Sequence, residues 1–178
     1  MIVLIAGASH VGKTLLAQGM LEKYGYPYFS IDHLKMGLIR SGYTDLTPED
    51  DDALTEYLWP IVREMVKTAI ENRQNLIVEG CYSPPDWRKD FSEEYLRSIE
   101  FVCLAMSDAY IDAHIGEIRE YARAIEARLD DSGCTLSELK EGNHRCIDAF
   151  TECDEKVTIV ESDFEATIEA VLEQFNPV

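Results

Sequence analysis

The residues best suited to chemistry form one short loop near the start of the chain. The spacing G-x-x-x-x-G-K-[ST] is matched by Gly7, Gly12, Lys13 and Thr14, directly after the apolar run 1–6. Glycines at these positions let the backbone curl so that successive N–H groups point inward and hold phosphate oxygens. The helix expected to follow presents its positive N-terminal end to the same anion. The motif therefore predicts a loop that binds the phosphates of a nucleoside triphosphate.

Every residue of this loop is a candidate for nucleotide contact. We expect Lys13 to reach the β- and γ-phosphates and to act in catalysis, and Thr14 to bind Mg²⁺. His10 occupies a variable position of the motif, so we expect it only to line the loop. The residues expected to cradle the phosphates are Gly7, Ala8, Ser9, His10, Val11, Gly12, Lys13 and Thr14.

Two carboxylates follow later apolar segments of the chain. Asp32 comes after the segment 28–30, and Glu79 closes the segment 75–79. In phosphoryl transfer, a carboxylate beside the acceptor hydroxyl can orient it and accept its proton. We predict this catalytic and acceptor-binding role for Asp32, with a helix N-cap as the alternative. Glu79 is predicted to hold Mg²⁺ or the acceptor, or else to bond to loop amides as an ordinary strand-end acid.

Cations near these carboxylates indicate an anionic acceptor. On a helix starting at Asp32, the side chains of Lys35 and Arg40 fall on either side of it, within an arc of roughly 140°. For Lys35 alone, a solvated surface lysine is the structural alternative. Arg88 follows in a loop with two prolines and could clamp a phosphate or carboxylate with its two-pronged guanidinium. Tyr82, in the same loop, is predicted to contact the same acceptor.

A second pair of cations lies on a later helical segment. Arg119 and Arg123 are one turn apart, beside an apolar stripe, where they could close over the triphosphate and stabilise the charge in transfer. The alternative is helix-surface pairing with Glu120 and Glu126.

The elements that would position these residues alternate along the chain. Short apolar runs predict strands at 1–6, 28–30, 75–79, 100–105 and 156–160. Helices are expected directly after the glycine loop, over 34–40, from about Ser107 to Leu129, over 135–152 and over 162–175. A further helix is expected to begin at Thr47, and Pro60 is predicted to kink or divide that helix. Strands alternating with helices predict a parallel sheet covered on both faces, with ligands bound beyond the carboxyl ends of the strands.

Composition narrows the class of protein. With 178 residues and 46% hydrophobic content, the chain can bury one core, so we expect a single domain over 1–178. The net charge of −18 would repel nucleic acid and anionic membranes, and we expect neither as a partner. Five cysteines without a C-x-x-C pair indicate reduced thiols and no metal cluster. The first apolar run is too short for a membrane span, so we expect a cytoplasmic protein.

Taken in order, these segments resemble the small P-loop kinases, the group of nucleoside monophosphate, shikimate and gluconate kinases. The resemblance rests on the loop 7–14, on Asp32, on the segment 76–80 and on the helix bearing Arg119 and Arg123. More narrowly, 30–35 and 78–82 are similar to bacterial proteins labelled 2-phosphoglycerate kinase-like or adenylate kinase-like. The Asp-Gly-x-Pro-Arg element of adenylate kinases is replaced here by Glu79-Gly80-Cys81-Tyr82-Ser83, which disfavours AMP as acceptor.

The resemblance implies an α/β, three-layer P-loop NTPase fold with a five-stranded parallel sheet in the order 2-3-1-4-5. It also implies a helical lid around 107–133 and transfer of the γ-phosphoryl group of ATP with Mg²⁺. The expected function is a kinase for a small hydroxylated, anionic metabolite. Two alternatives stay open: a nucleotide-binding switch or regulatory protein without a small acceptor, and a toxin-like phosphotransferase acting on a cell-wall precursor.

Overall fold

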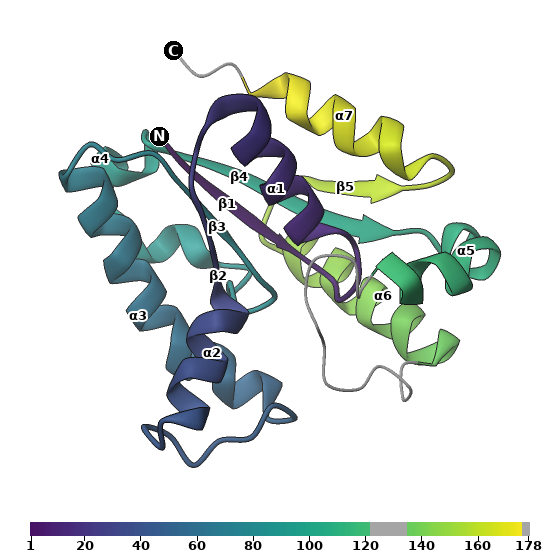
Figure 1. Cartoon of the computed structure of the whole chain (residues 1–178), viewed down its shortest axis with the longest axis horizontal. Coiled ribbons are helices and arrows are strands. Elements are labelled where there is room, and N and C mark those ends of the chain that lie inside the picture. Colours follow the sequence, from purple (N-terminus) through teal and green to yellow (C-terminus); the bar gives the residue numbers. More distant parts are fainter. Residues whose placement is uncertain (122–134, 176–178) are drawn as a thin grey trace.

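The sheet has the strand order expected of the fold class. The computed structural model describes residues 1–121 and 135–175, and its five strands run in the order β2-β3-β1-β4-β5 (Figure 1). Every neighbouring pair is parallel. The strands are β1 (Ile2–Gly7), β2 (Tyr28–Ser30), β3 (Leu76–Glu79), β4 (Ile99–Met106) and β5 (Val157–Val160). The prediction of an α/β fold with order 2-3-1-4-5 is confirmed.

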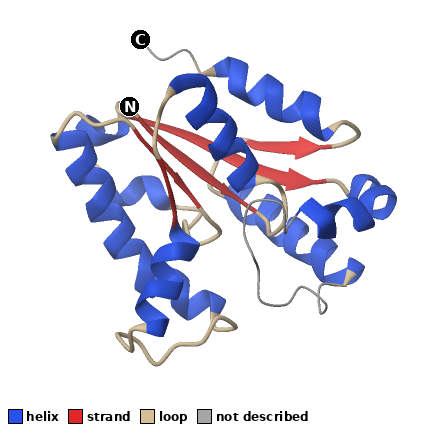
Figure 2. Ribbon diagram, in the orientation of Figure 1, coloured by secondary structure: helices blue, strands red, loops and turns tan. Residues whose placement is uncertain are grey.

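Helices cover both faces of the sheet, giving three layers (Figure 2). One face carries α1 (Lys13–Tyr24) and α7 (Phe164–Gln174), and the other carries α3 (Asp51–Glu71) and α6 (Leu136–Glu152). The remaining helices connect these layers: α2 (Ile31–Arg40), the 3₁₀ turn η1 (Trp87–Asp90), α4 (Glu93–Leu96) and α5 (Asp108–Tyr121).

The central strand shows why the sheet is covered twice. Successive side chains of a strand point to opposite faces, and all of β1 is buried. Val3 and Ile5 pack with residues of α1 and α7, whereas Ile2 and Leu4 pack with residues of α3 and η1. An uninterrupted apolar strand therefore needs a helical layer on each side. These two layers hold β1 in place, and with it the glycine loop that follows β1.

The start of α3 differs from the prediction. The sequence placed the helix start at Thr47, but the N-cap is Asp50 and the first helical residue is Asp51. The Asp50 carboxylate accepts hydrogen bonds from the Thr47 backbone N–H (2.7 Å) and hydroxyl (2.9 Å). This closes a turn ahead of the helix, because an aspartate can satisfy nearby N–H groups in a turn as well as in a cap. These bonds lower the pKa of Asp50.

Pro60 was predicted to kink or divide this helix, and it does not divide it. The helix α3 is assigned as one segment, Asp51–Glu71, with Pro60 inside it. Leu58, Trp59 and Val62 on either side of the proline are buried against the sheet. Tertiary packing of that face offsets the one backbone hydrogen bond that proline removes.

The expected helix from Ser107 is present in its described part. The Ser107 hydroxyl accepts from the Tyr110 N–H at 3.1 Å, and α5 begins at Asp108. Ile115 and Ile118, on the predicted apolar face, pack against the core. The backbone leaves helical geometry at His114, whose ring stacks on Tyr110. The rest of the predicted helix and most of the second half of the predicted lid lie outside the described residues.

Two further predictions concern a membrane-spanning segment and the state of the cysteines. Within residues 1–121 and 135–175, no helix combines the length and the apolar character needed to cross a membrane. Four of the five cysteines fall in this part of the chain, and each is a free thiol: Cys81, Cys103, Cys146 and Cys153.

Candidate nucleotide and acceptor site

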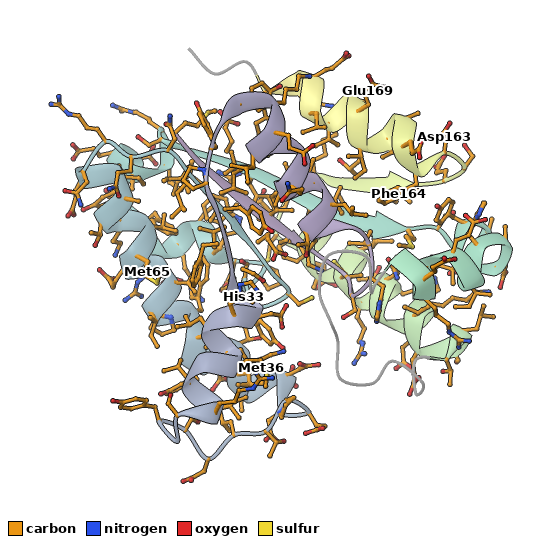
Figure 3. The ribbon with its side chains drawn as sticks, viewed as in Figure 1. His33, Met36, Met65, Asp163, Phe164 and Glu169 are labelled. Carbon is orange, nitrogen blue, oxygen red and sulfur yellow. The ribbon has the colours of Figure 1, made fainter. Side chains whose placement is uncertain are left out.

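The loop between β1 and α1 has a backbone that glycine alone accommodates at two points. Gly7 has φ +142°, and a Cβ there would lie 2.2 Å from the carbonyl oxygen of Leu104 on β4. Gly12 has φ +86°, and a Cβ there would lie 2.4 Å from the ring of Phe164, at the start of α7 (Figure 3). Because β4 and α7 hold the loop this closely, its N–H groups are set before any ligand arrives, as a phosphate-binding loop requires.

Lys13, the first residue of α1, lies under this loop. Its side chain is buried, and Nζ donates to the carbonyl oxygens of Ala8 (2.6 Å) and Gly7 (3.2 Å). Burial by itself disfavours the ammonium, but Cys81, Glu79 and Asp32 outweigh it, and the pKa of Lys13 is raised above its ordinary value. Lys13 is therefore a fixed positive charge at the centre of the loop.

The groups that raise the pKa of Lys13 end or follow β2 and β3, so the ends of these two strands and of β1 meet around Lys13. Ser30, the last residue of β2, pairs in register with Glu79, the last of β3, and Glu79 pairs with Ile5 of β1. Asp32 follows the end of β2, and Cys81 follows the end of β3. The carboxylates that end or follow β3 and β2, Glu79 and Asp32, are therefore close enough to Lys13 to act on its charge.

Asp32 lies in the first turn of α2 and is not its N-cap, which is Ser30. Its Oδ1 forms an ion pair with Lys35 Nζ at 2.6 Å. Its second oxygen, Oδ2, forms no hydrogen bond or ion pair with a described residue. Lys35 thus orients the carboxylate and leaves one oxygen able to accept a proton.

Tyr82 connects this ion pair to the start of α3. Its hydroxyl accepts from Lys35 Nζ at 2.7 Å and donates to Asp51 Oδ1 at 3.2 Å, and the side chain is buried. Burial, together with the nearby Asp32 and Asp51 carboxylates, raises the pKa of Tyr82. The phenol therefore stays neutral and keeps donating. Tyr82, predicted to contact the acceptor, holds α2, α3 and the loop after β3 in one network.

The two residues predicted to bind Mg²⁺ occupy suitable places. Thr14 lies in the first turn of α1, next to Lys13, and Glu79 is 1% exposed at the end of β3. A hydroxyl beside the loop and a buried carboxylate at the end of β3 are ligand types that suit a Mg²⁺ also held by phosphate oxygens and water. Across residues 1–121 and 135–175, no three His, Cys, Asp or Glu side chains are grouped to hold a metal ion without such help.

Three predicted cations are not brought to this network. Arg40 is exposed at the last position of α2, eight residues and about 12 Å along the helix from Asp32. Arg88 forms a two-pronged ion pair with Glu155 (Nη2 to Oε2, 3.1 Å) and lies over the Trp87 ring. Because Glu155 precedes β5, this pair ties η1 to the sheet. Arg119 is exposed near the end of α5, and Arg123 lies outside the described residues.

A cleft of about 790 Å³ opens beside the loop. Its described lining comprises residues 7–10 of the loop, Cys81, Ser83, Pro84 and Pro85 after β3, Asp51, Asp52, Thr55 and Glu56 of α3, and Glu138, Leu139, Gly142, Arg145, Cys146 and Phe150 of α6.

Several of these lining residues were missed by sequence reasoning. Arg145 is one, although Glu138, Gly142 and Arg145 recur at the i, i+4, i+7 spacing of a single helix face. That spacing was the available signal. Asp51, Asp52 and Glu56 fall inside the helix predicted from Thr47, but sequence reasoning gave none of them, nor Ser83, a role at the site.

A glycine-framed loop between β1 and α1, a buried lysine and the strand order 2-3-1-4-5 together define the small P-loop kinase fold class. The family model described as Zeta toxin matches residues 1–108, more than half of the chain. The chain belongs to the Zeta toxin family. The matched part ends at the first residue of α5, so it includes the glycine loop, Asp32, Tyr82 and the acidic start of α3.

Solved structures with the same fold are distant in sequence. The chain is similar to a deoxyadenosine kinase from M. mycoides (16% identity, TM-score 0.59, 98% of each chain covered). It is also similar to a shikimate kinase from Bacteroides thetaiotaomicron (16%, 0.57, 98% of this chain and 97% of that one) and to an unliganded sugar kinase from Janibacter sp. HTCC2649 (18%, 0.56, 97% and 92%). No curated protein matches the sequence. At these identities the comparison establishes the fold and leaves the substrate open.

Proposed function

We propose that this protein is a kinase that transfers the γ-phosphoryl group of ATP, with Mg²⁺, to a hydroxyl group of a small metabolite. The observation that carries the proposal is the placement of Asp32 beside the phosphate loop, close enough to Lys13 to favour its charged form, with Oδ2 unengaged by any described residue. A nucleotide-binding switch has no need of an oriented carboxylate at that point.

The donor side is supported by the preformed loop. Its N–H groups and Lys13 suit the β- and γ-phosphates, and Thr14 and Glu79 suit Mg²⁺. When bound, Mg²⁺ neutralises charge on the phosphates in transfer. The choice of ATP over other nucleoside triphosphates follows the family resemblance.

The transfer step assigns one task to each side chain. The acceptor oxygen bonds to the γ-phosphorus as the bond from that phosphorus to the β,γ-bridging oxygen breaks, and ADP leaves. The hydroxyl proton passes to Asp32 Oδ2. Lys35 holds Oδ1 so that Oδ2 faces the hydroxyl, and Lys13 stabilises charge on the phosphates. In this proposal Arg119, on the described part of α5, contributes positive charge near the nucleotide, and the second predicted arginine, Arg123, lies outside the described residues.

The proposal is tested by acceptor-stimulated ADP release from purified protein with ATP and Mg²⁺. The acceptors are phosphoglycerates, sugar acids, neutral sugars, amino sugars and nucleosides, each at several concentrations. We expect at least one hydroxylated compound to raise ADP release well above the water-only rate and to appear as its phosphate ester in mass spectrometry. ADP release that no compound in any of these classes increases would contradict the proposal.

A toxin-like phosphotransferase acting on a cell-wall precursor is the second candidate, and the family match favours it. In that case, induced expression in a bacterial host should arrest growth, and the Asp32→Asn variant should not. The measurement is growth and cell lysis after induction at matched protein levels. Normal growth with well-expressed wild-type protein, combined with phosphorylation of a free metabolite in the assay above, would favour the metabolic kinase.

A further inference from the structure

Two cysteine thiols lie against each other beside the strand that carries the phosphate loop. The sulfur atoms of Cys103 on β4 and Cys146 on α6 are 3.7 Å apart, although 43 residues separate them in the chain. Cys103 pairs in register with Ala6, the residue before Gly7. In the part of the chain that the structure describes, no other two cysteine sulfurs lie within hydrogen-bond distance. This pair is therefore a candidate dithiol.

The packing of α6 against β4 sets the position of Cys146 (Figure 1). One turn before it, Asn143 is buried, and its Oδ1 accepts from the backbone N–H of Met106, at the end of β4, at 2.7 Å. One turn after it, Phe150 packs with Cys103 in a small apolar cluster. The fold therefore holds the two thiols together from both sides.

The two sulfurs differ in access and in charge. Cys103 is fully buried, whereas Cys146 is partly exposed and lines the cleft beside the loop. The hydrogen bond from Cys103, the charge of Lys13 and the backbone of Ala8 lower the pKa of Cys146, against the effect of burial. The same hydrogen bond and burial raise the pKa of Cys103. The thiol that a small solute can reach is therefore also the thiol that ionises.

Packing alone would explain only one member of the pair. A free cysteine behaves as a small apolar side chain in a core, which accounts for Cys103. It does not account for Cys146, whose sulfur faces a cleft and a buried lysine. An accessible thiolate beside a second, buried thiol is the arrangement found in cysteines that respond to oxidants.

We propose that Cys146 and Cys103 form a site of reversible oxidation, at which hydrogen peroxide or an organic hydroperoxide converts the two thiols into a disulfide that links α6 to β4 beside the phosphate loop. The sulfurs must approach from 3.7 Å to about 2.0 Å, a movement of less than about 2 Å. No second chain is needed, because both thiols belong to one core.

The reaction divides into two displacements. The Cys146 thiolate attacks one oxygen of the hydroperoxide, the O–O bond breaks, and the leaving oxygen takes a proton and departs as water or an alcohol. Cys146 is then a sulfenic acid. The Cys103 sulfur attacks the Cys146 sulfur, the S–O bond breaks, and the hydroxide that leaves takes the Cys103 proton as water. Two thiols are oxidised, and the hydroperoxide is reduced.

Occupancy of the phosphate loop should control the first displacement. Residues 7–10 of the loop line the same cleft as Cys146, and the charge of Lys13 favours the thiolate. Phosphates bound to the loop would offset that charge and cover the sulfur on its cleft side. The empty protein is therefore the form that is sensitive to oxidation. This step rests on the proposed function, whereas the dithiol itself does not.

The test exposes the reduced full chain to hydrogen peroxide, alkylates the remaining thiols and maps the cysteine peptides by mass spectrometry. We expect a disulfide between Cys103 and Cys146 within one chain, reversed by dithiothreitol. Cys146 should lose its thiol at least about threefold faster than the exposed Cys153. Absence of this disulfide, pairing of either cysteine with another partner, or faster oxidation of Cys153 would overturn the proposal.

Three variants separate the roles of the two thiols. Cys103→Ala should stop the reaction at the sulfenic acid of Cys146, which dimedone traps. Cys146→Ala should leave Cys103 reduced, because peroxide does not reach it. Cys153→Ala is the matched control and should form the disulfide at the wild-type rate. Oxidation of Cys103 at the wild-type rate in Cys146→Ala would show that the order of attack is wrong. The mapping of the wild type does not depend on the folding of any variant.

The link to the loop has its own measurement. Saturation with Mg²⁺ and a non-hydrolysable ATP analogue should slow the loss of the Cys146 thiol at least about threefold and leave Cys153 unaffected. Equal rates at a saturation verified by calorimetry would overturn the link. If calorimetry detects no binding of the nucleotide while the disulfide still forms, the proposed function fails and the dithiol stands.

Discussion

The Asp32→Asn variant is expected to lose at least about 100-fold in kcat while it binds ATP as tightly as the wild type. An amide cannot accept the proton of the acceptor hydroxyl, but it keeps the size of the side chain and can still bond to Lys35. The effect should appear in kcat, because the phosphates are held by the loop and Lys13. The measurement is steady-state ADP release with the best acceptor, together with the dissociation constant for ATP by calorimetry.

Asp112→Asn is the matched control for this variant. Asp112 on α5 forms an ion pair with Lys140 of α6 at 2.8 Å, so its replacement removes an Asp–Lys contact of similar geometry at another place. We expect its kcat to equal that of the wild type. Full turnover by Asp32→Asn would show that the base assignment is wrong, and an equal loss in both variants would attribute the effect to structure.

Lys13→Met should lower kcat/KM by about 100- to 1,000-fold and also weaken the binding of ATP. The methionine keeps much of the buried volume but removes the charge that Asp32, Glu79 and Cys81 stabilise. The loss should exceed that of any exposed lysine, because a charge in a buried site acts on the phosphates with little screening by water. Nucleotide titration and steady-state kinetics measure the two effects separately.

Lys23→Met provides the control on the same helix. Lys23 is exposed in the last turn of α1, over the ring of Tyr24, and faces no part of the cleft lining described above. Its replacement should leave both kinetic constants unchanged. If Lys13→Met retained wild-type affinity for ATP and wild-type kcat, the loop would not be a nucleotide site, and the proposed function would fall with it.

Local sequence signals predicted the donor half of the site because that half is local. Loop, lysine and threonine lie within eight consecutive residues, and the apolar strand and helix that flank them are adjacent in the chain. Glycine at positions 7 and 12 meets a backbone requirement that any such loop shares. The strand order was inferred from resemblance, since no short segment specifies which strands become neighbours.

The acceptor half could not be predicted as well, because its charges are set by pairs distant in sequence. Arg88 appeared available until Glu155, 67 residues later, was brought against it. Tyr82 meets Asp51 across 31 residues and Lys35 across 47. Whether a cation faces a ligand or a neighbouring carboxylate depends on packing that one-dimensional spacing does not contain.

The sequence by itself determined that a phosphate-binding loop stands at the end of the first strand, and that Asp32 and Glu79 follow strands whose carboxyl ends share an edge. The tertiary structure decided which charges line the cleft beside them. It did so by pairing Lys35 and Arg88 with their own acids and by turning the start of α3 toward the loop. Packing decides whether a cation faces the cleft or a neighbouring carboxylate, and the spacing of residues along the chain does not contain that packing.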